Sequence, residues 1–165
     1  MKTLFFARHA KSSWRDADLS DIDRPLKGRG ILNAYQMGSH LRQQGLMPDT
    51  MITSPAVRAF HTAVIYARQL DFSLDQLAVN QLIYSGASSG VMEVVQQVDD
   101  QYDSIMVFGH NPTFTHLVNH LSNSSIDNLP TSGVAAISFA IDSWADCGKK
   151  PGKLEHFFYP KMFDQ

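Results

Sequence analysis

Arginine and histidine side chains stand directly after three separate apolar runs of the sequence. The run "LFFA" leads into Arg8 and His9, "MIT" leads through Ser-Pro-Ala-Val into Arg58, and "IMVFG" leads into His110. A planar guanidinium group matches phosphate oxygens, and histidine can serve near neutral pH as a nucleophile, an acid or a hydrogen-bond donor. Each residue alone is typical of a solvated or structural position, but the repeated placement predicts a site for a phosphoryl group.

The elements that must position these residues alternate between short apolar runs and helical patterns, which predicts an α/β fold with a mostly parallel sheet. The carboxyl ends of parallel strands lie along one edge, so residues about a hundred positions apart in the sequence meet there. The predicted strands are 2–7, 51–53, 78–84 and 105–108, with two late strands within 132–141 and 153–160 as an antiparallel edge pair. The predicted helices are 28–44, 55–70, the segment of Val91, Val94, Val95 and Val98, and a helix from Asn111-Pro112 to about 121.

Two of these helices begin with a polar residue followed by proline, as Ser54-Pro55 and Asn111-Pro112. The polar side chain can cap the helix, and proline lacks an N–H that the first turn would leave unpaired. Helix N-termini present free N–H groups and a positive dipole end to anions. Both helix starts therefore favour the same anion site.

Length and composition predict one globular domain, residues 1–165, because 165 residues with 44% hydrophobic content suffice for a full core. A net charge of -2 and a pI near 6.4 make nucleic acid and an anionic membrane surface poor partners. The charge is uneven, since the first 30 residues hold seven Lys or Arg against four Asp. We expect an anionic ligand to bind the N-terminal part.

The opening residues do not fit an export signal, because Arg8 interrupts the apolar run well short of the roughly 7 to 15 residues that a signal peptide needs. No apolar stretch approaches the roughly 18 to 20 residues needed to span a bilayer. Cys147 is the single cysteine and cannot form an internal disulfide. These features predict a cytoplasmic protein with an inert thiol.

Four segments, "ARHAKSSW", "DIDRPLKGRG", "ITSPAVRAFHTA" and "VFGHNPTF", together resemble the histidine phosphatase superfamily, in its small SixA-like phosphohistidine phosphatase branch. They follow the family's order over nearly the whole chain. The resemblance implies a three-layer αβα sandwich of the phosphoglycerate mutase type. It also implies a covalent phosphohistidine intermediate on His9, with Arg8, Arg58 and His110 completing the phosphate pocket.

Two further positions match the family's pattern. Ser12 matches a polar position near the phosphate, and Arg24 either reaches the rim of the cleft to bind substrate or pairs with the aspartates around it. Lys11 and Arg15 either add a positive rim that steers an anion or are solvated loop charges.

The chemistry can be stated from the residues themselves. Neutral His9 attacks phosphorus in line while the other three side chains hold the equatorial oxygens, and water then hydrolyses the phosphohistidine. Cationic side chains neutralise the charge, so we expect neither a metal nor a cofactor. Attack requires an unprotonated nitrogen, so the other ring nitrogen is expected to donate to a backbone carbonyl in the same loop. Ala10 replaces the glycine of the family's usual triplet, so the loop cannot depend on a positive φ there.

The segment "NQLIYSGASSG" contains no carboxylate where mutase and phosphomonoesterase relatives carry a general acid. The loss of an acid, which typically contributes about 10²- to 10⁴-fold, affects an alcohol leaving group most. Phosphohistidine differs, because a proton on its distal nitrogen lets it depart as neutral imidazole. We therefore expect a phosphohistidine-bearing signalling or phosphotransfer protein as partner, although Tyr84, Ser85 or Asp16 could still donate a proton.

Two other functions remain open on the same scaffold. The protein could be a small-molecule phosphomonoesterase or phosphoramidase, or a binding module that recognises phosphate without catalysis. Binding alone would not require a nucleophile, which counts against the last of these.

Three histidines and two hydroxyl residues have no assigned role in this scheme. His116 and His120 have the i, i+4 spacing of a metal pair but no evident third ligand, and His61 either orients Arg58 or lies on the surface. Thr131 and Ser132 either support the site or form a plain turn.

Overall fold

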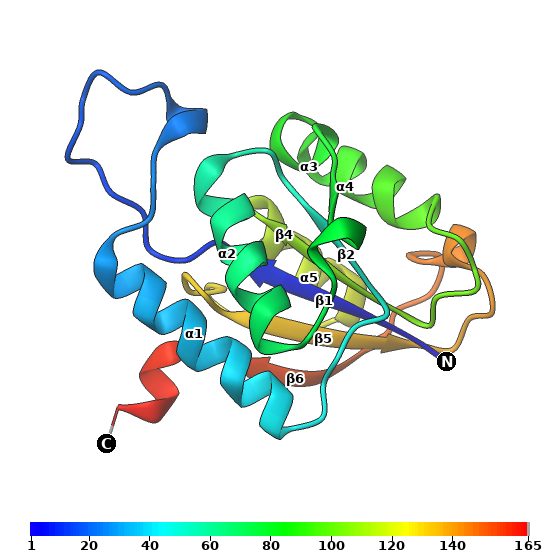
Figure 1. Ribbon diagram of the computed structural model, residues 1–165. Coiled ribbons are helices and arrows are strands. Elements are labelled where there is room, and N and C mark those ends of the chain that lie inside the picture. The colour runs from blue at the N-terminus through cyan, green and yellow to red at the C-terminus, as the bar shows by residue number, and fades with distance from the viewer. Residues whose placement is uncertain (165) are drawn as a thin grey trace.

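The computed structural model describes residues 1–164, which form a six-stranded mixed sheet with helices on both faces (Figure 1). The strand order is β3-β2-β4-β1-β5-β6. The first four of these strands run parallel, and β5 and β6 pair antiparallel at one edge. This arrangement confirms the predicted α/β class with a mostly parallel sheet and an antiparallel pair at its edge.

The strands are β1 Lys2–Arg8, β2 Thr50–Thr53, β3 Ala78–Val79, β4 Ser104–Gly109, β5 Val134–Phe139 and β6 Lys153–Phe158. The α-helices are α1 Gly28–Gln43, α2 Val57–Gln69, α3 Leu82–Ser85, α4 Ala87–Gln96 and α5 Thr113–Ser122. Four short 3-10 helices are η1 Asp21–Asp23, η2 Leu74–Gln76, η3 Trp144–Asp146 and η4 Pro160–Phe163.

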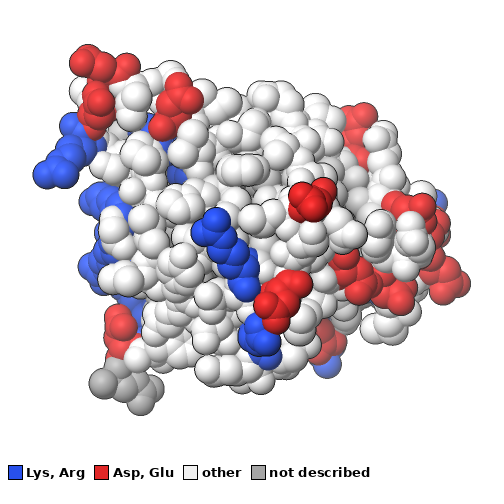
Figure 2. Space-filling view, in the orientation of Figure 1, with Lys and Arg blue, Asp and Glu red and all other residues white. Residues whose placement is uncertain are grey.

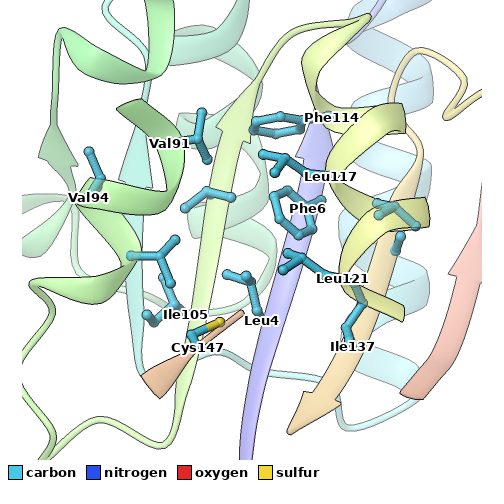
Figure 3. Close-up of a cluster of buried hydrophobic side chains, with 14 of the residues drawn as sticks. Leu4, Phe6, Val91, Val94, Ile105, Phe114, Leu117, Leu121, Ile137 and Cys147 are labelled. Atoms are coloured by element: carbon cyan, nitrogen blue, oxygen red, sulfur yellow. The ribbon is translucent and has the colours of Figure 1, made fainter. Parts of the chain in front are cut away.

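The middle residues of the central strands are apolar, and their side chains are buried on both faces of the sheet. Successive side chains of a strand point to opposite faces, so Leu4 and Phe6 of β1 join one core cluster whereas Phe5 and Ala7 join the other. Helices α1 and α2 cover the second cluster, and α4 and α5 cover the first. Figure 3 shows this first cluster, in which the rings of Phe6 and Phe114 meet edge to face at 5.1 Å.

One predicted strand is wrong over most of its length. Strand β3 covers only Ala78–Val79, and the chain then turns into α3 at Leu82 instead of continuing extended to 84. The Asn80 side chain accepts a hydrogen bond from the backbone N–H of Leu82, which favours this turn. The short apolar run 82–84 fits a buried helical turn as well as it fits a strand, so its pattern alone did not separate the two.

The two polar residues predicted to cap helices, Ser54 and Asn111, bind backbone N–H groups at the helix starts but are not the cap residues themselves. Helix α2 begins at Val57, two residues later than predicted, with Ala56 as its cap residue, yet the Ser54 hydroxyl accepts the Ala56 N–H at 3.1 Å. Helix α5 begins after Pro112, and the Asn111 side-chain oxygen accepts the Thr115 N–H at 3.1 Å. The polar residues thus stabilise the helix starts, but Ser54 lies two residues before the cap residue of α2 and Asn111 lies one residue before that of α5.

No helix within residues 1–164 combines the length and the apolar character that crossing a membrane requires.

Candidate active site

The ends of the central strands bring the predicted site residues to one edge of the sheet. Arg8, at the end of β1, is paired with Gly109 at the end of β4, so His9 and His110 follow side by side. Their rings lie 5.4 Å apart between centroids. A cavity of about 440 Å³ at this edge is lined by all six predicted site residues, namely Arg8, His9, Ser12, Arg24, Arg58 and His110.

His9 is buried and its ring orientation is fixed by the backbone. Its Nδ1 lies 2.7 Å from the carbonyl oxygen of Ala10, and because a carbonyl only accepts, Nδ1 carries the proton and donates it. Nε2 of the neutral ring is therefore left with a lone pair. Burial, together with the positive charges of Arg58 and Arg8, lowers the pKa of His9 to about 3. The ring is neutral at physiological pH, in the tautomer expected from the sequence.

The loop that holds His9 is connected to the helix that holds Arg58. The Ala10 N–H donates to the Thr62 hydroxyl at 2.9 Å, and that hydroxyl donates to the Arg58 carbonyl at 2.7 Å. Ala10 does not have a positive φ, in agreement with the expectation for a residue with a Cβ. Thr62 is fully buried and was not singled out by the sequence.

Three buried nitrogen atoms in the cavity-lining side chains make no hydrogen bond within residues 1–164: Arg8 Nε, Arg58 Nε and His110 Nδ1. A buried donor without a partner costs about 1–3 kcal/mol, so native proteins rarely leave several together. The rest of each side chain is held, since Arg8 Nη1 donates to the Leu129 carbonyl at 3.0 Å and His110 Nε2 lies 2.8 Å from the Ser54 hydroxyl. Burial lowers the pKa of His110 to about 4. This grouping is typical of a preformed anion site.

Ser12 and Arg24 contact each other in one wall of the cavity. Arg24 Nη1 donates to the Ser12 hydroxyl at 2.8 Å, and the Arg24 guanidinium stacks 3.5 Å from the centroid of the exposed Trp14 ring. Arg24 Nε also pairs with Asp21 at 3.2 Å. Of the two alternatives left open for Arg24, the structure therefore has both: it lines the cavity and pairs with a neighbouring aspartate.

Asp21 also lines the cavity, and sequence reasoning missed it. Arg58 donates to it twice, from Nη1 to its backbone carbonyl at 2.7 Å and from Nη2 to its carboxylate at 3.0 Å. Tyr84 donates to the same carboxylate oxygen at 2.8 Å. The hydrogen bond from Tyr84, with those from Arg58 and Arg24, lowers the pKa of Asp21 to about 2. Its one sequence signal is its place three residues before Arg24 in "DIDR", among four aspartates of one loop.

The remaining candidates divide between the cavity and its surroundings. Lys11 and Thr131 line the cavity, whereas Arg15 lines a neighbouring groove together with Trp14. Ser132 supports the loop that holds His9 through its backbone, because its N–H donates to the His9 carbonyl at 3.1 Å. Tyr84 does not line the cavity but contacts two residues that do, donating to Asp21 and packing edge to face against the His110 ring at 5.5 Å between centroids. The other two proton donors considered, Asp16 and Ser85, do not line the cavity.

The three other histidines that the sequence singled out lie outside the cavity. His61 is half-buried on α2, and His116 and His120 are exposed on α5, where their rings stack at 5.9 Å. No group of three His, Cys, Asp or Glu side chains in residues 1–164 is arranged to hold a metal ion.

Charge is unevenly distributed over the surface, as the sequence predicted. Figure 2 shows Lys and Arg gathered along the edge that carries the loop between β1 and α1, although the tip of that loop also carries acidic side chains. Asp and Glu gather at the opposite end, near η3. The positive edge includes Lys11, which lines the cavity, so an approaching anion is attracted toward the site.

Comparison of the sequence and the fold with those of known proteins identifies the structural class and the family of this chain. The architecture is that of the phosphoglycerate mutase-like α/β proteins. The chain belongs to the histidine phosphatase superfamily (branch 1), whose pattern matches residues 4–80. An uncharacterized protein of Mycobacterium tuberculosis is 32% identical over 165 residues, which cover 93% of this chain and 99% of that protein. An uncharacterized chloroplastic protein of Arabidopsis thaliana is 30% identical over 171 residues, covering 96% of this chain and 78% of that protein.

Solved structures agree in fold. A protein assigned as phosphohistidine phosphatase SixA from Nakamurella multipartitia superposes with a TM-score of 0.83 at 24% identity, covering 96% of each chain. The protein histidine phosphatase SixA in complex with tungstate superposes with a TM-score of 0.81 at 21% identity, covering 97% of this chain and 98% of that one. At these identities the likeness establishes the fold.

Proposed function

We propose that the protein is a phosphohistidine phosphatase that removes phosphate from a phosphorylated histidine of a signalling or phosphotransfer protein. The observation that carries this proposal is that one cavity is lined both by the neutral imidazole of His9, whose Nε2 keeps a lone pair, and by three side chains with an unpartnered buried nitrogen, Arg8, Arg58 and His110. A phosphoryl group supplies one electrophile and several anionic oxygens, so it fits both features. We propose in addition that residues 1–165 act as one histidine phosphatase domain.

His9 is the proposed nucleophile. Its Nε2 lone pair attacks phosphorus, and the imidazole can deliver that pair at neutral pH because its pKa lies near 3. The Ala10 carbonyl accepts a hydrogen bond from Nδ1–H and so stabilises the positive charge that develops on the ring as the N–P bond forms. Water then attacks the phosphorylated His9 and releases inorganic phosphate.

Arg8, Arg58 and His110 are the proposed phosphate ligands. Each contributes a nitrogen that has no protein partner and is already desolvated, so little reorganisation is needed as charge redistributes in the transition state. When the Ser54 hydroxyl donates to His110 Nε2, the ring proton lies on Nδ1, which is then a donor toward the phosphate. Arg24 and Ser12 are proposed to hold the substrate at the rim.

The substrate class follows from the leaving group. Residues 80 to 92 supply no carboxylic acid, and Asp21, the carboxylate in the cavity, is ionised at neutral pH and cannot protonate an alkoxide. Phosphohistidine needs no such acid when its distal nitrogen is protonated. A small-molecule phosphomonoesterase or phosphoramidase is the second candidate. Its substrate would need a leaving group that, like protonated phosphohistidine, departs without a general acid.

The test compares the wild type with His9→Ala on a phosphohistidine protein, phosphoramidate and p-nitrophenyl phosphate. The wild type is expected to hydrolyse the first two and to trap acid-labile phosphate on His9, whereas His9→Ala loses turnover and labelling. His120→Ala, which removes an exposed imidazole outside the cavity, is the control and should retain both. Acid-labile phosphate on the His9→Ala protein would refute the assignment of the nucleophile. Hydrolysis of p-nitrophenyl phosphate without hydrolysis of the phosphohistidine protein or phosphoramidate would refute the substrate class.

A further inference from the structure

Asp21 places a carboxylate in a cavity whose other charged groups are cationic. Arg8, Arg24 and Arg58 line the same cavity, and so do Lys11 and Lys27. A site built for phosphate alone would exclude a carboxylate, because like charges at close range destabilise the bound anion. Asp21 is paired with Arg24 and Arg58, which offsets part of this repulsion, and the ligand group that it can favour is one that is cationic or donates a hydrogen bond.

The carboxylate keeps an acceptor position for a ligand. An ionised carboxylate offers about four lone-pair positions. Side chains of the protein take three of them: Arg24 Nε on Oδ1, and Arg58 Nη2 and Tyr84 Oη on Oδ2. The Asp21 side chain is 51% exposed, so the remaining position is open to the cavity and to solvent. The three donors fix the orientation of the Asp21 carboxylate and leave one of its acceptor positions unoccupied.

We infer that the Asp21 carboxylate accepts a hydrogen bond from the distal ring nitrogen of the substrate's phosphohistidine and so selects a protonated, cationic leaving group. This inference rests on the proposed function and adds to it the residue that recognises the leaving group. Asp21 is ionised at neutral pH because its pKa lies near 2, so it can serve as an acceptor throughout the working range.

The chemistry balances without an added acid. In the bound substrate one ring nitrogen is bonded to phosphorus and the other carries a proton, so the ring is cationic. His9 Nε2 forms its bond to phosphorus as the N–P bond of the substrate breaks, and that bond's electron pair stays on the departing nitrogen. The ring leaves as neutral imidazole, with the distal N–H still bonded to Asp21. Asp21 transfers no proton and acts by increasing the protonated fraction of bound substrate.

The charged and titratable groups that face Asp21 come from four elements. They are Arg24 beyond η1, Arg58 on α2, Tyr84 on α3 and His110 after β4. His110 stays neutral above about pH 4 and Tyr84 has a raised pKa, so none of the titrating groups changes charge between pH 6 and 8.5, the window of the test below. The substrate ring is then the titrating group that Asp21 contacts.

The test measures kcat/KM for wild type, Asp21→Asn and Asp23→Asn between about pH 6 and 8.5, on a chemically phosphorylated histidine peptide and on p-nitrophenyl phosphate. Asparagine keeps an acceptor oxygen for Arg24 or Arg58 but loses the charge. If the carboxylate raises the pKa of the bound ring by about one unit, its loss lowers the protonated fraction about tenfold above that pKa and little below it. Asp21→Asn is therefore expected to lose activity on the peptide progressively as pH rises. Its loss on p-nitrophenyl phosphate should be the same at every pH.

Asp23→Asn is the matched control, because it removes the same charge two residues along η1 from an exposed side chain that does not line the cavity. It should follow the wild type on both substrates. Equal, pH-independent losses for Asp21→Asn on both substrates would overturn the inference and assign Asp21 to holding Arg58 alone. A wild type that does not hydrolyse the peptide would instead overturn the proposed function, so the two failures are distinguishable.

Discussion

Replacing Thr62 with valine is expected to destabilise the fold and to disturb the loop that holds His9, although Thr62 itself does not line the cavity. Valine keeps the shape of threonine and removes its hydroxyl. That hydroxyl is fully buried and makes two hydrogen bonds, accepting the Ala10 N–H at 2.9 Å and donating to the Arg58 carbonyl at 2.7 Å. The variant leaves the buried Ala10 N–H without a partner.

The cost can be worked out from these contacts. An unpartnered buried donor costs about 1–3 kcal/mol. The Arg58 carbonyl loses one of two acceptor contacts but keeps the backbone helix bond, so its contribution is small. We expect a loss of about 2 kcal/mol in the free energy of unfolding, which lowers Tm by about 4–8 °C in a domain of this size. If the loop shifts to hydrate Ala10, the Ala10 carbonyl moves away from His9 Nδ1 and kcat falls as well.

Urea unfolding and steady-state kinetics on p-nitrophenyl phosphate measure the two effects. Thr62→Ser is the control, because it keeps the hydroxyl and removes a buried methyl group. It should lose stability without losing kcat, since both hydrogen bonds remain available. A Thr62→Val protein with wild-type stability and wild-type kcat would show that the hydroxyl bridge does not hold the loop, and the reasoning would be refuted.

Three further predictions concern titration and packing. The pKa values of His9 and His110 are lowered in the folded protein, so below about pH 6.5 the unfolded chain binds more protons than the folded chain. The stability present above that pH is therefore lost as pH falls toward about 3. His9→Gln should flatten the curve of stability against pH, measured by urea unfolding, between those limits. Burial raises the pKa of the Cys147 thiol to about 12, so a thiol reagent should react with it only after denaturation, and rapid labelling of the native protein would contradict this. A Cβ on Gly109 would lie 2.5 Å from the Phe114 ring, so Gly109→Ala should lower Tm, and an unchanged Tm would show that the ring gives way freely.

The sequence predicted the central strands well because their signal is local and strong. A run such as Ile105–Phe108 is apolar at every position, which is typical of a strand with both faces buried. The edge of the sheet gave a weaker signal, because β3 is two exposed residues long and carries no alternation. The stretch after it was predicted as strand and is helix α3, since four residues are too few to show a period.

The site could be predicted where its residues follow strong strands and not where they come from a loop. Arg8, His9 and His110 follow β1 and β4 directly, so the topology of a parallel sheet brings them together without further information. Asp21 reaches Arg58 across 37 residues of sequence from a segment with no periodic pattern. Nothing in the composition of that loop separates Asp21 from Asp16, Asp18 or Asp23, so only the folded geometry could distinguish it.

The corrected strand and the missed carboxylate have a common physical origin. Helix α3 turns the chain at Leu82 and places Tyr84 against Asp21. An extended strand through residue 84 would have carried that side chain along the sheet, leaving Asp21 with the two arginines as its donors. The segment that contains this turn supplies no acidic side chain to the cavity. The carboxylate there is that of Asp21, whose pKa is lowered by hydrogen bonds from three donors. A carboxylate held in that way is a poor general acid and a good acceptor, and the proposed preference for a leaving group that brings its own proton rests on this property.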